Sequence, residues 1–276
     1  MSSALPPDQE PLLGASSSKK GAARQSEDLV IGSSSAARNA WMDQPPDDDI
    51  PDDFKVGVTV ADCDEAIRRA FLRKVYAILL CQVGLTALTA AVLMIPEAAD
   101  FIHQHSWIIW TAMIGTFVSL GLTYWKRHSF PANMFCLALF TLCESIMIGS
   151  AVSYYDTFVV LQALLITSGV FVGLTLFTFQ TKYDFSSFGP FLFAGLWGLI
   201  TAGFVGFFLP FSHGFDIAIA CAGVLIFSGY ILYDTQQIMK RLSVDEAILG
   251  SLTLYLDFIN LFLYVLRLLN SQNDNN

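Results

Sequence analysis

Long apolar runs alternate with short polar connections over the last three quarters of the chain. Each run has about 20 residues or more, the length that a helix needs to cross a hydrocarbon core of ~30 Å. The pattern therefore predicts an all-α integral membrane protein built as a seven-transmembrane-helix bundle. We expect the seven spans at residues 75–95, 106–125, 132–155, 157–179, 188–211, 215–239 and 247–269. Small residues four positions apart are expected to let helices pack closely, at Gly169 and Gly173, Gly198 and Ala202, and Ala202 and Gly206.

The polar and small residues of the last two spans follow one face of each helix. In the stretch 243–270 they recur every three or four positions, at Glu246, Gly250, Thr253, Asp257, Asn260, Tyr264 and Arg267. The preceding span carries a similar stripe, at Gly223, Phe227, Tyr230, Asp234, Gln237 and Arg241. Positions at this spacing share one face of an α-helix. Because the connection 240–246 is short, with Ser243 and Glu246 spaced as a capping box, we expect the two helices to pack antiparallel.

Asp234 and Asp257 carry the clearest chemical signal on these stripes. A carboxylate alone in hydrocarbon is costly, so each aspartate should face the protein interior and find its partner in the other. Two carboxyls that share one site cannot both ionise easily, and they hold one proton between them and titrate as a unit. We therefore predict a pH-sensing and gating pair: protonated, it ties the two helices together, and ionised, it separates them or binds a cation.

Glu144 is a further intramembrane acid, at the centre of the third span beside Thr141 and Ser145. Two interpretations stay open for it. Either Glu144 lines the same cavity as the aspartates, or it is a neutral acid that is hydrogen-bonded between helices. The other candidates for lining a path are polar residues of the two stripes: Tyr230, Gln237, Thr253, Asn260 and Tyr264.

Charge divides the chain into parts. The net charge is −9, but residues 1–65 hold 13 of the 24 acidic and only 5 of the 15 basic residues. Rich in Ser, Pro and Asp, residues 1–64 are predicted to form a disordered acidic cytosolic tail, because they cannot bury enough apolar surface to offset chain entropy. Residues 65–270 form the membrane domain, and residues 271–276 form a short polar C-terminal tail. Since the acidity belongs to the tail, nothing indicates nucleic-acid binding.

The basic residues predict the orientation. They stand before the first span and in every second connection after it, at Arg68, Arg69, Arg73, Lys74, Lys126, Arg127, Lys182, Lys240 and Arg241. Basic connections stay in the cytosol, so we expect a cytosolic N-terminus and a C-terminus on the far side. Arg267, the only basic residue inside a span, sits near its end and can snorkel to the interface.

The spans also exclude several chemistries. They contain no lysine for a retinal Schiff base and no central histidine for a zinc hydrolase. An intramembrane aspartyl protease is an alternative, because Tyr233 and Asp234 resemble the first motif of that class. The second motif needs a Gly-rich approach to its aspartate, whereas bulky Leu254, Tyr255 and Leu256 precede Asp257. We therefore expect no enzymatic activity and no cofactor.

Three stretches resemble the signatures of the Bax inhibitor-1 family, also called the transmembrane Bax-inhibitor-motif family, and of its lifeguard branch in particular. They are GLTLFTFQTKYDF at 173–185, YDTQQIM at 233–239 and DEAILGSLTLYLDFINLFLYVLRLL at 245–269. The resemblance covers roughly residues 65–270. It implies a seven-helix fold and a pH-sensitive gate made by aspartates of the last two helices, at the positions of Asp234 and Asp257. Some relatives pair this gate with a basic residue deep in the second helix, and the second span here has none.

The resemblance also implies a function. We expect a calcium leak channel of intracellular membranes, with a role in calcium homeostasis, the stress response and suppression of cell death. Ca²⁺ would be the transported ion, with Asp234 and Asp257 as its candidate ligands. The expected location is the endoplasmic reticulum, the Golgi or the vacuole, and the expected partners are the lipid bilayer and other death-regulating or calcium-handling membrane proteins. A non-conducting membrane scaffold that acts through such partners is the alternative.

Overall fold

The structure, a computed structural model, describes residues 59–127, 129–209 and 212–273. They belong to one compact unit, Gly57–Asn276. Most of the predicted disordered tail lies outside the described residues, but its last residues are ordered. Thr59 forms a β-bridge with Ser243, and the Val60 N–H donates to the carbonyl of Leu242 at 3.0 Å. The side chain of Val60, which the prediction assigns to the tail, is fully buried in the core.

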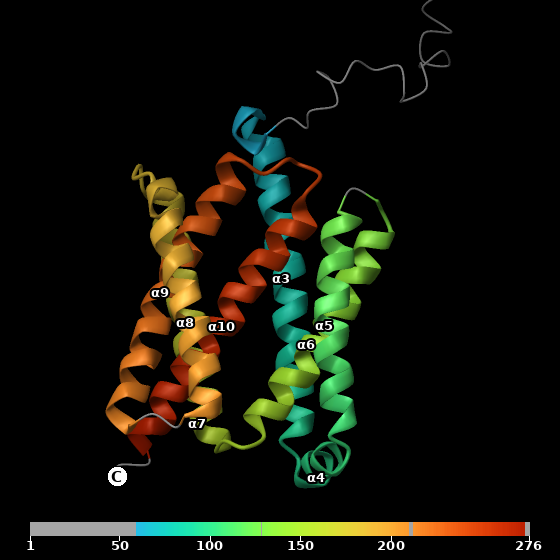
Figure 1. The fold of residues 1–276 in the computed structure, drawn as a ribbon. Coiled ribbons are helices and arrows are strands. Elements are labelled where there is room, and N and C mark those ends of the chain that lie inside the picture. Colours follow the sequence, from blue (N-terminus) through green and yellow to red (C-terminus); the bar gives the residue numbers. More distant parts are fainter. Residues whose placement is uncertain (1–58, 128, 210–211, 274–276) are drawn as a thin grey trace, which may run out of the picture. The chain divides into compact units, whose positions relative to one another are not determined.

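Among the described residues, seven helices are long and apolar enough to cross a membrane. They coincide with the seven predicted spans, which confirms the all-α membrane bundle (Figure 1). Their bounds are α3 Glu65–Leu93, α5 Trp107–Trp125, α6 Ala132–Val152, α7 Thr157–Gln180, α8 Gly189–Phe208, α9 His213–Lys240 and α10 Ala247–Asn273. Two short 3₁₀ helices are also present: η2, Val60–Asp62, precedes α3, and η3, Phe185–Phe188, lies between α7 and α8. α10 extends into the predicted C-terminal tail, and residues 274–276 lie outside the described residues.

The helix α4, Pro96–Gln104, is not indicated by the pattern of apolar spans. Pro96 follows shortly after the end of α3 and begins α4, where its missing N–H and fixed φ suit the first helical position. α4 is too short to cross a membrane. It buries Ile102, while Glu97 and Asp100 stay exposed, and it lies at the end of the bundle where α3 finishes (Figure 1).

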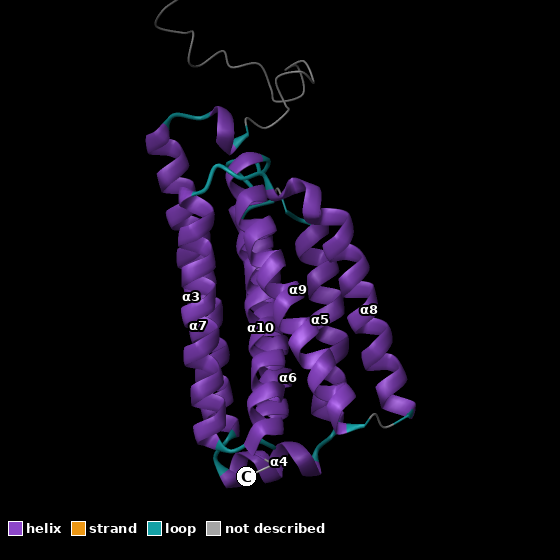
Figure 2. Ribbon diagram, turned by 90° about the vertical axis from the view of Figure 1, so that its left-hand side faces the viewer, coloured by secondary structure: helices purple, strands orange, loops and turns teal. Residues whose placement is uncertain are grey.

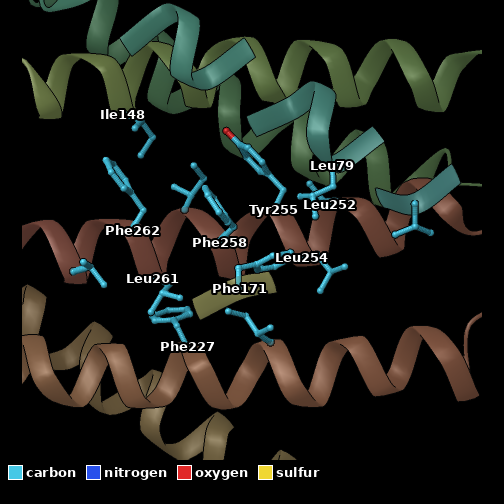
Figure 3. Close-up of a cluster of buried hydrophobic side chains, with 14 of the residues drawn as sticks. Leu79, Ile148, Phe171, Phe227, Leu252, Leu254, Tyr255, Phe258, Leu261 and Phe262 are labelled. Carbon is cyan, nitrogen blue, oxygen red and sulfur yellow. The ribbon is translucent and has the colours of Figure 1, made fainter. Parts of the chain in front are cut away.

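The centre of the bundle is α10, which packs against α3, α6, α7 and α9. The central window of α10 is 67% buried, compared with 11% for the span that contains α8. Figure 2 shows α3 and α7 on one side of α10 and α8 on the other. Figure 3 shows the apolar side chains of α10 directed to both sides, with Tyr255 and Phe258 facing one way and Leu261 the other. α10 is therefore the element that positions the candidate site.

The predicted close packing of small residues is wrong for the glycines that the structure tests. A β-carbon added at Gly169, Gly173 or Gly198 would meet no atom within 4 Å, apart from the neighbouring residues and the backbone of its own helix. The spacing of small residues shows that a helix face is flat, but it does not say which face meets another helix. The close approach occurs on α9 instead, where Gly223 lies directly against the ring of Tyr264.

The connections fall at two ends of the bundle. α3 begins at the end where α5 joins α6, α7 joins α8 and α9 joins α10, and α4 lies at the opposite end (Figure 1). The first end carries nine basic residues, and we call it the basic end: Arg68, Arg69, Arg73, Lys74, Lys126, Arg127, Lys182, Lys240 and Arg241. That this end faces the cytosol stays a prediction.

Candidate functional site

The site is built on the pairing of α9 with α10. Their connection is short, and the Glu246 carboxylate accepts a hydrogen bond from the Ser243 N–H at 3.3 Å, as expected for the glutamate half of a capping box. Glu246 also pairs with Arg127 in the α5–α6 connection, at 3.4 Å. These contacts fix the turn at the basic end, so that α10 returns antiparallel along α9.

Residues of the α10 stripe contact α9 near both ends of the pair. Gly250 contacts Ile238 and Leu242 near the basic end. Farther along, the ring of Tyr264 stacks on Phe227 with 5.7 Å between centroids. At the opposite end, the Arg267 guanidinium donates to the carboxylate of Asp216 at 2.5 Å. Arg267 therefore has a partner on α9 in addition to the predicted access to the membrane interface.

Asp234 and Asp257 meet between these contacts. Their carboxyl groups lie within hydrogen-bonding range of each other, and Asp257 is only 5% exposed. A carboxylate has no hydrogen to donate, so the two can bond to each other only when one of them is protonated. The Oδ2 oxygen of Asp257 is buried and has no hydrogen-bond partner among the described residues. The site thus brings two carboxyls together and leaves one buried acceptor that no described residue satisfies.

The other predicted stripe residues surround the pair at different distances. Tyr230 lies close enough to both carboxyls to interact with them electrostatically. Gln237 donates to the hydroxyl of Tyr233 at 2.7 Å, one turn nearer the basic end. Thr253 and Asn260 use their side chains within α10, where they donate to the carbonyls four residues earlier, at 3.0 and 2.8 Å. The role of these residues in lining a path stays a prediction.

A small polar pocket lies at the basic end, next to this face. Its volume is about 50 Å³, and it is lined by Asp184, Ser186, Tyr233, Gln236, Gln237, Lys240 and Arg241. Gln236 holds the α7–α8 connection to α9, because its amide accepts from the Phe185 N–H at 2.6 Å and donates to the Tyr183 carbonyl at 2.7 Å. Hydrogen bonds from Ser186 hold the pKa of the exposed Asp184 carboxyl below its usual value, and Lys240 adds to this effect.

Glu144 belongs to a different polar cluster. Its carboxyl interacts with Thr116 of α5 and is close to Tyr255 of α10. Tyr255 and Asp257 are two positions apart, about 200° around a helix, so the cluster and the aspartate pair lie on opposite faces of α10. Glu144 therefore lies beside Thr116 and Tyr255 rather than beside the aspartates, and both interpretations of its role stay open.

Three residues of this second cluster escape the sequence pattern. The Tyr255 hydroxyl lies 2.7 Å from that of Thr86, and Gln82 donates to Thr141 at 3.1 Å. Gln82 and Thr86 are both buried, and their spacing of four residues in an apolar span is the signal that could have found them. The bulky Tyr255, whose size argues against protease chemistry at Asp257, thus contributes its hydroxyl to the second polar cluster.

The aspartate pair does not form a complete metal site by itself. No group of three or more His, Cys, Asp or Glu side chains that could hold a metal ion is found among the described residues. Ca²⁺ takes about six to eight oxygen ligands. Two carboxyls with the nearby Tyr230 hydroxyl could therefore bind a passing Ca²⁺ only together with water or backbone oxygens.

Comparison with known proteins agrees with this architecture. The model of the family described as "Inhibitor of apoptosis-promoting Bax1" matches residues 68–274. The chain is 44% identical to Bax inhibitor 1 of Schizosaccharomyces pombe over 231 residues, 82% of this chain and 86% of the relative. It is 44% identical to Protein lifeguard 4 of Mus musculus over 232 residues, which are 83% of this chain and 96% of the relative. A Golgi anti-apoptotic protein of Vaccinia virus is 42% identical over 228 residues, 81% of this chain and 94% of the relative.

Proposed function

The chain belongs to the family of inhibitors of apoptosis-promoting Bax1, a family of anti-apoptotic membrane proteins, and on that premise we propose that it is a pH-sensitive calcium leak channel. The channel lies in intracellular membranes, and the carboxyl pair of Asp234 and Asp257 is its gate. The protein regulates calcium homeostasis and the stress response. It suppresses cell death through the amount of Ca²⁺ held in the intracellular compartment.

One observation carries the proposal: two carboxyls are held against each other inside a span, where hydrocarbon would otherwise surround them. Burying two acids next to each other costs free energy that packing alone does not recover. An ordinary structural contact would use a neutral amide or an oppositely charged partner. The arrangement is suited to a group that changes its protonation state while the protein works.

The gating step follows from the chemistry of the pair. With one shared proton, a hydrogen bond joins α9 to α10 and the path is closed. When that proton leaves, two like charges face each other in a medium of low dielectric constant and repel strongly. α9 and α10 then separate, or a cation takes the place of the proton. The polar pocket at the basic end supports this step, because its lining residues Tyr233 and Gln237 stand within one turn of Asp234 on α9.

Calcium is the proposed ion because a doubly ionised carboxyl pair favours a hard divalent cation. Its remaining ligands would be water, the Tyr230 hydroxyl and backbone carbonyls. Glu144, Thr253, Asn260 and Tyr264 are proposed to line the path. The proposed location is the endoplasmic reticulum or the Golgi, with the vacuole as a third compartment and the basic end in the cytosol. The viral relative is named as a Golgi protein, which supports an endomembrane location.

The proposal is tested with the full chain reconstituted in liposomes that contain a calcium-sensitive dye. We expect Ca²⁺ entry that is slow at acid pH and faster at alkaline pH. Asp100→Asn is the matched control, because it makes the same substitution at an exposed aspartate of α4, outside the α9–α10 pair, and its pH profile should equal that of the parent chain. No flux at any pH would contradict the channel and favour a scaffold that acts through partner proteins. Cleavage of a membrane peptide that is lost in Asp257→Asn would favour the aspartyl protease.

A further inference from the structure

An apolar groove runs along the bundle between α3 and α7. Near the basic end it has a volume of about 290 Å³, and its continuation toward the opposite end adds about 180 Å³. Val83 and Phe258 line both parts. From Tyr76 on α3 to Met94 at its C-terminal cap the groove spans 19 residues, a rise of about 27 Å that is close to the thickness of a hydrocarbon core.

The groove exposes the central helix. Its walls come from α3 and α7, and α10 contributes Phe258, Ile259 and Phe262. Figure 2 shows α3 and α7 on the same side of α10, and Figure 3 shows Phe258 among the side chains on one face of α10. Phe258 is only 4% exposed, so a molecule in the membrane can touch it only from within the groove.

An aromatic pair borders the groove at the end nearest the basic end. The rings of Tyr76 on α3 and Phe179 on α7 meet edge to face, with 5.9 Å between centroids. Three residues before Tyr76 stands Arg73, and three residues after Phe179 stands Lys182. Both basic side chains are exposed, and neither has an ionic partner among the described residues. Two cations without partners thus flank the position where the groove reaches the membrane surface.

We propose that this groove binds an anionic phospholipid. One acyl chain fills the part of the groove nearest the basic end and touches Phe258 of α10, and the phosphate lies between Arg73 and Lys182. A hydrocarbon chain is the occupant that fits, because the walls are apolar and open to the bilayer, and an empty groove would forfeit the dispersion contacts of its lining. The anionic class follows from the charge at the mouth, since Arg and Lys at an interface attract acidic headgroups.

The lipid site does not depend on ion conduction, and its test uses no flux. The full chain is placed in bilayer nanodiscs that contain a phospholipid with a photoreactive diazirine on one acyl chain, as the phosphatidylserine or as the phosphatidylcholine. After illumination, the modified residues are identified by mass spectrometry. Labelling of Leu225, which is 74% exposed in a separate groove between α8 and α9, shows that the probe has reached the protein.

We expect label on Phe258 or Phe171, at least threefold more from phosphatidylserine than from phosphatidylcholine. Ser168→Phe, which fills the groove, should abolish the label on α10. Ala77→Phe is the matched control, because Ala77 is exposed on α3 outside the groove lining, and it should leave the label unchanged. Arg73→Gln with Lys182→Gln should remove the preference for phosphatidylserine while the label itself remains.

Three results would overturn the proposal. The first is the absence of label on α10 while Leu225 is labelled. The second is equal labelling by both lipids in the parent chain, which would reduce the groove to a surface that bulk lipid wets. The third is label on α10 that persists unchanged in Ser168→Phe, which would show that the probe reaches α10 by another route than the groove.

Discussion

The ring of Tyr264 on α10 lies in the space that a β-carbon at Gly223 of α9 would occupy. The same ring stacks on Phe227 of α9. The Tyr264 side chain therefore packs against both the Phe227 ring and the backbone of Gly223. Gly223 lies about three turns from Asp234 along α9. The close approach at this glycine holds α9 and α10 near enough for the carboxyls of Asp234 and Asp257 to meet.

Gly223→Ala should therefore destabilise the bundle. The new methyl group must push the Tyr264 ring away, and overpacking of this kind costs about 1–3 kcal/mol. Gly173→Ala is the matched control, because Gly173 lies on α7 with no other helix near its α-carbon. Removing a flexible glycine from a helix there should be neutral or stabilise by about 0.5–1 kcal/mol. Thermal unfolding in detergent measures both, and equal melting temperatures for the two variants would show that the Tyr264 contact adapts at no cost.

Glu144→Gln should lower the calcium flux without moving its pH midpoint. The carboxyl is proposed to line the path, but it lies beside Thr116 and Tyr255 rather than beside the aspartates. Its loss should change the field along the path and leave the titration of the pair as it is. The measurement is flux against pH in liposomes, with expression and melting temperature as controls for folding. A shifted midpoint would place Glu144 in the gate, and unchanged flux at every pH would leave it a structural role.

The orientation predicts where the chain ends are accessible. A tag at residue 2 should be reached by antibody when only the plasma membrane is permeabilised, and a tag at residue 276 only after the inner membranes are opened. The reason is the alternation of basic residues together with seven crossings, of which α10 is the last. If both tags are reached in the first step, α10 does not cross the membrane in the cell.

The sequence was sufficient for the spans and for the two stripes, and the physical reason is local. A run of apolar residues must be helical in hydrocarbon, because each backbone N–H needs a partner within its own segment. The spacing of Asp234 and Asp257 along their helices says which face each occupies, and a short connection brings those faces together.

Other features depend on which helix stands next to which, and spacing does not carry that information. The contacts of Thr86 with Tyr255 and of Gln82 with Thr141 join helices that are far apart in the chain. The glycines of α7 have the spacing of a packing motif but face no neighbour. Pro96 lies just after the first span and also begins α4, a short helix that the apolar pattern does not indicate. The isolated β-bridge next to Val60 joins Thr59 to Ser243, which is more than 180 positions away in the chain.

The central claim is that Asp234 and Asp257 act as one titrating unit, and the pH midpoint of the calcium flux tests it most directly. Acid keeps the shared proton and the closed state, and alkali removes it. Asp→Asn at either position takes away that titration while it keeps the shape of the side chain. Each single variant should flatten the curve of flux against pH, and the double variant should add little, because interacting residues are not additive. The control Asp100→Asn should leave the curve unchanged. Independent and additive shifts of the midpoint in the two single variants would contradict the account, since carboxyls that titrate separately do not share a proton.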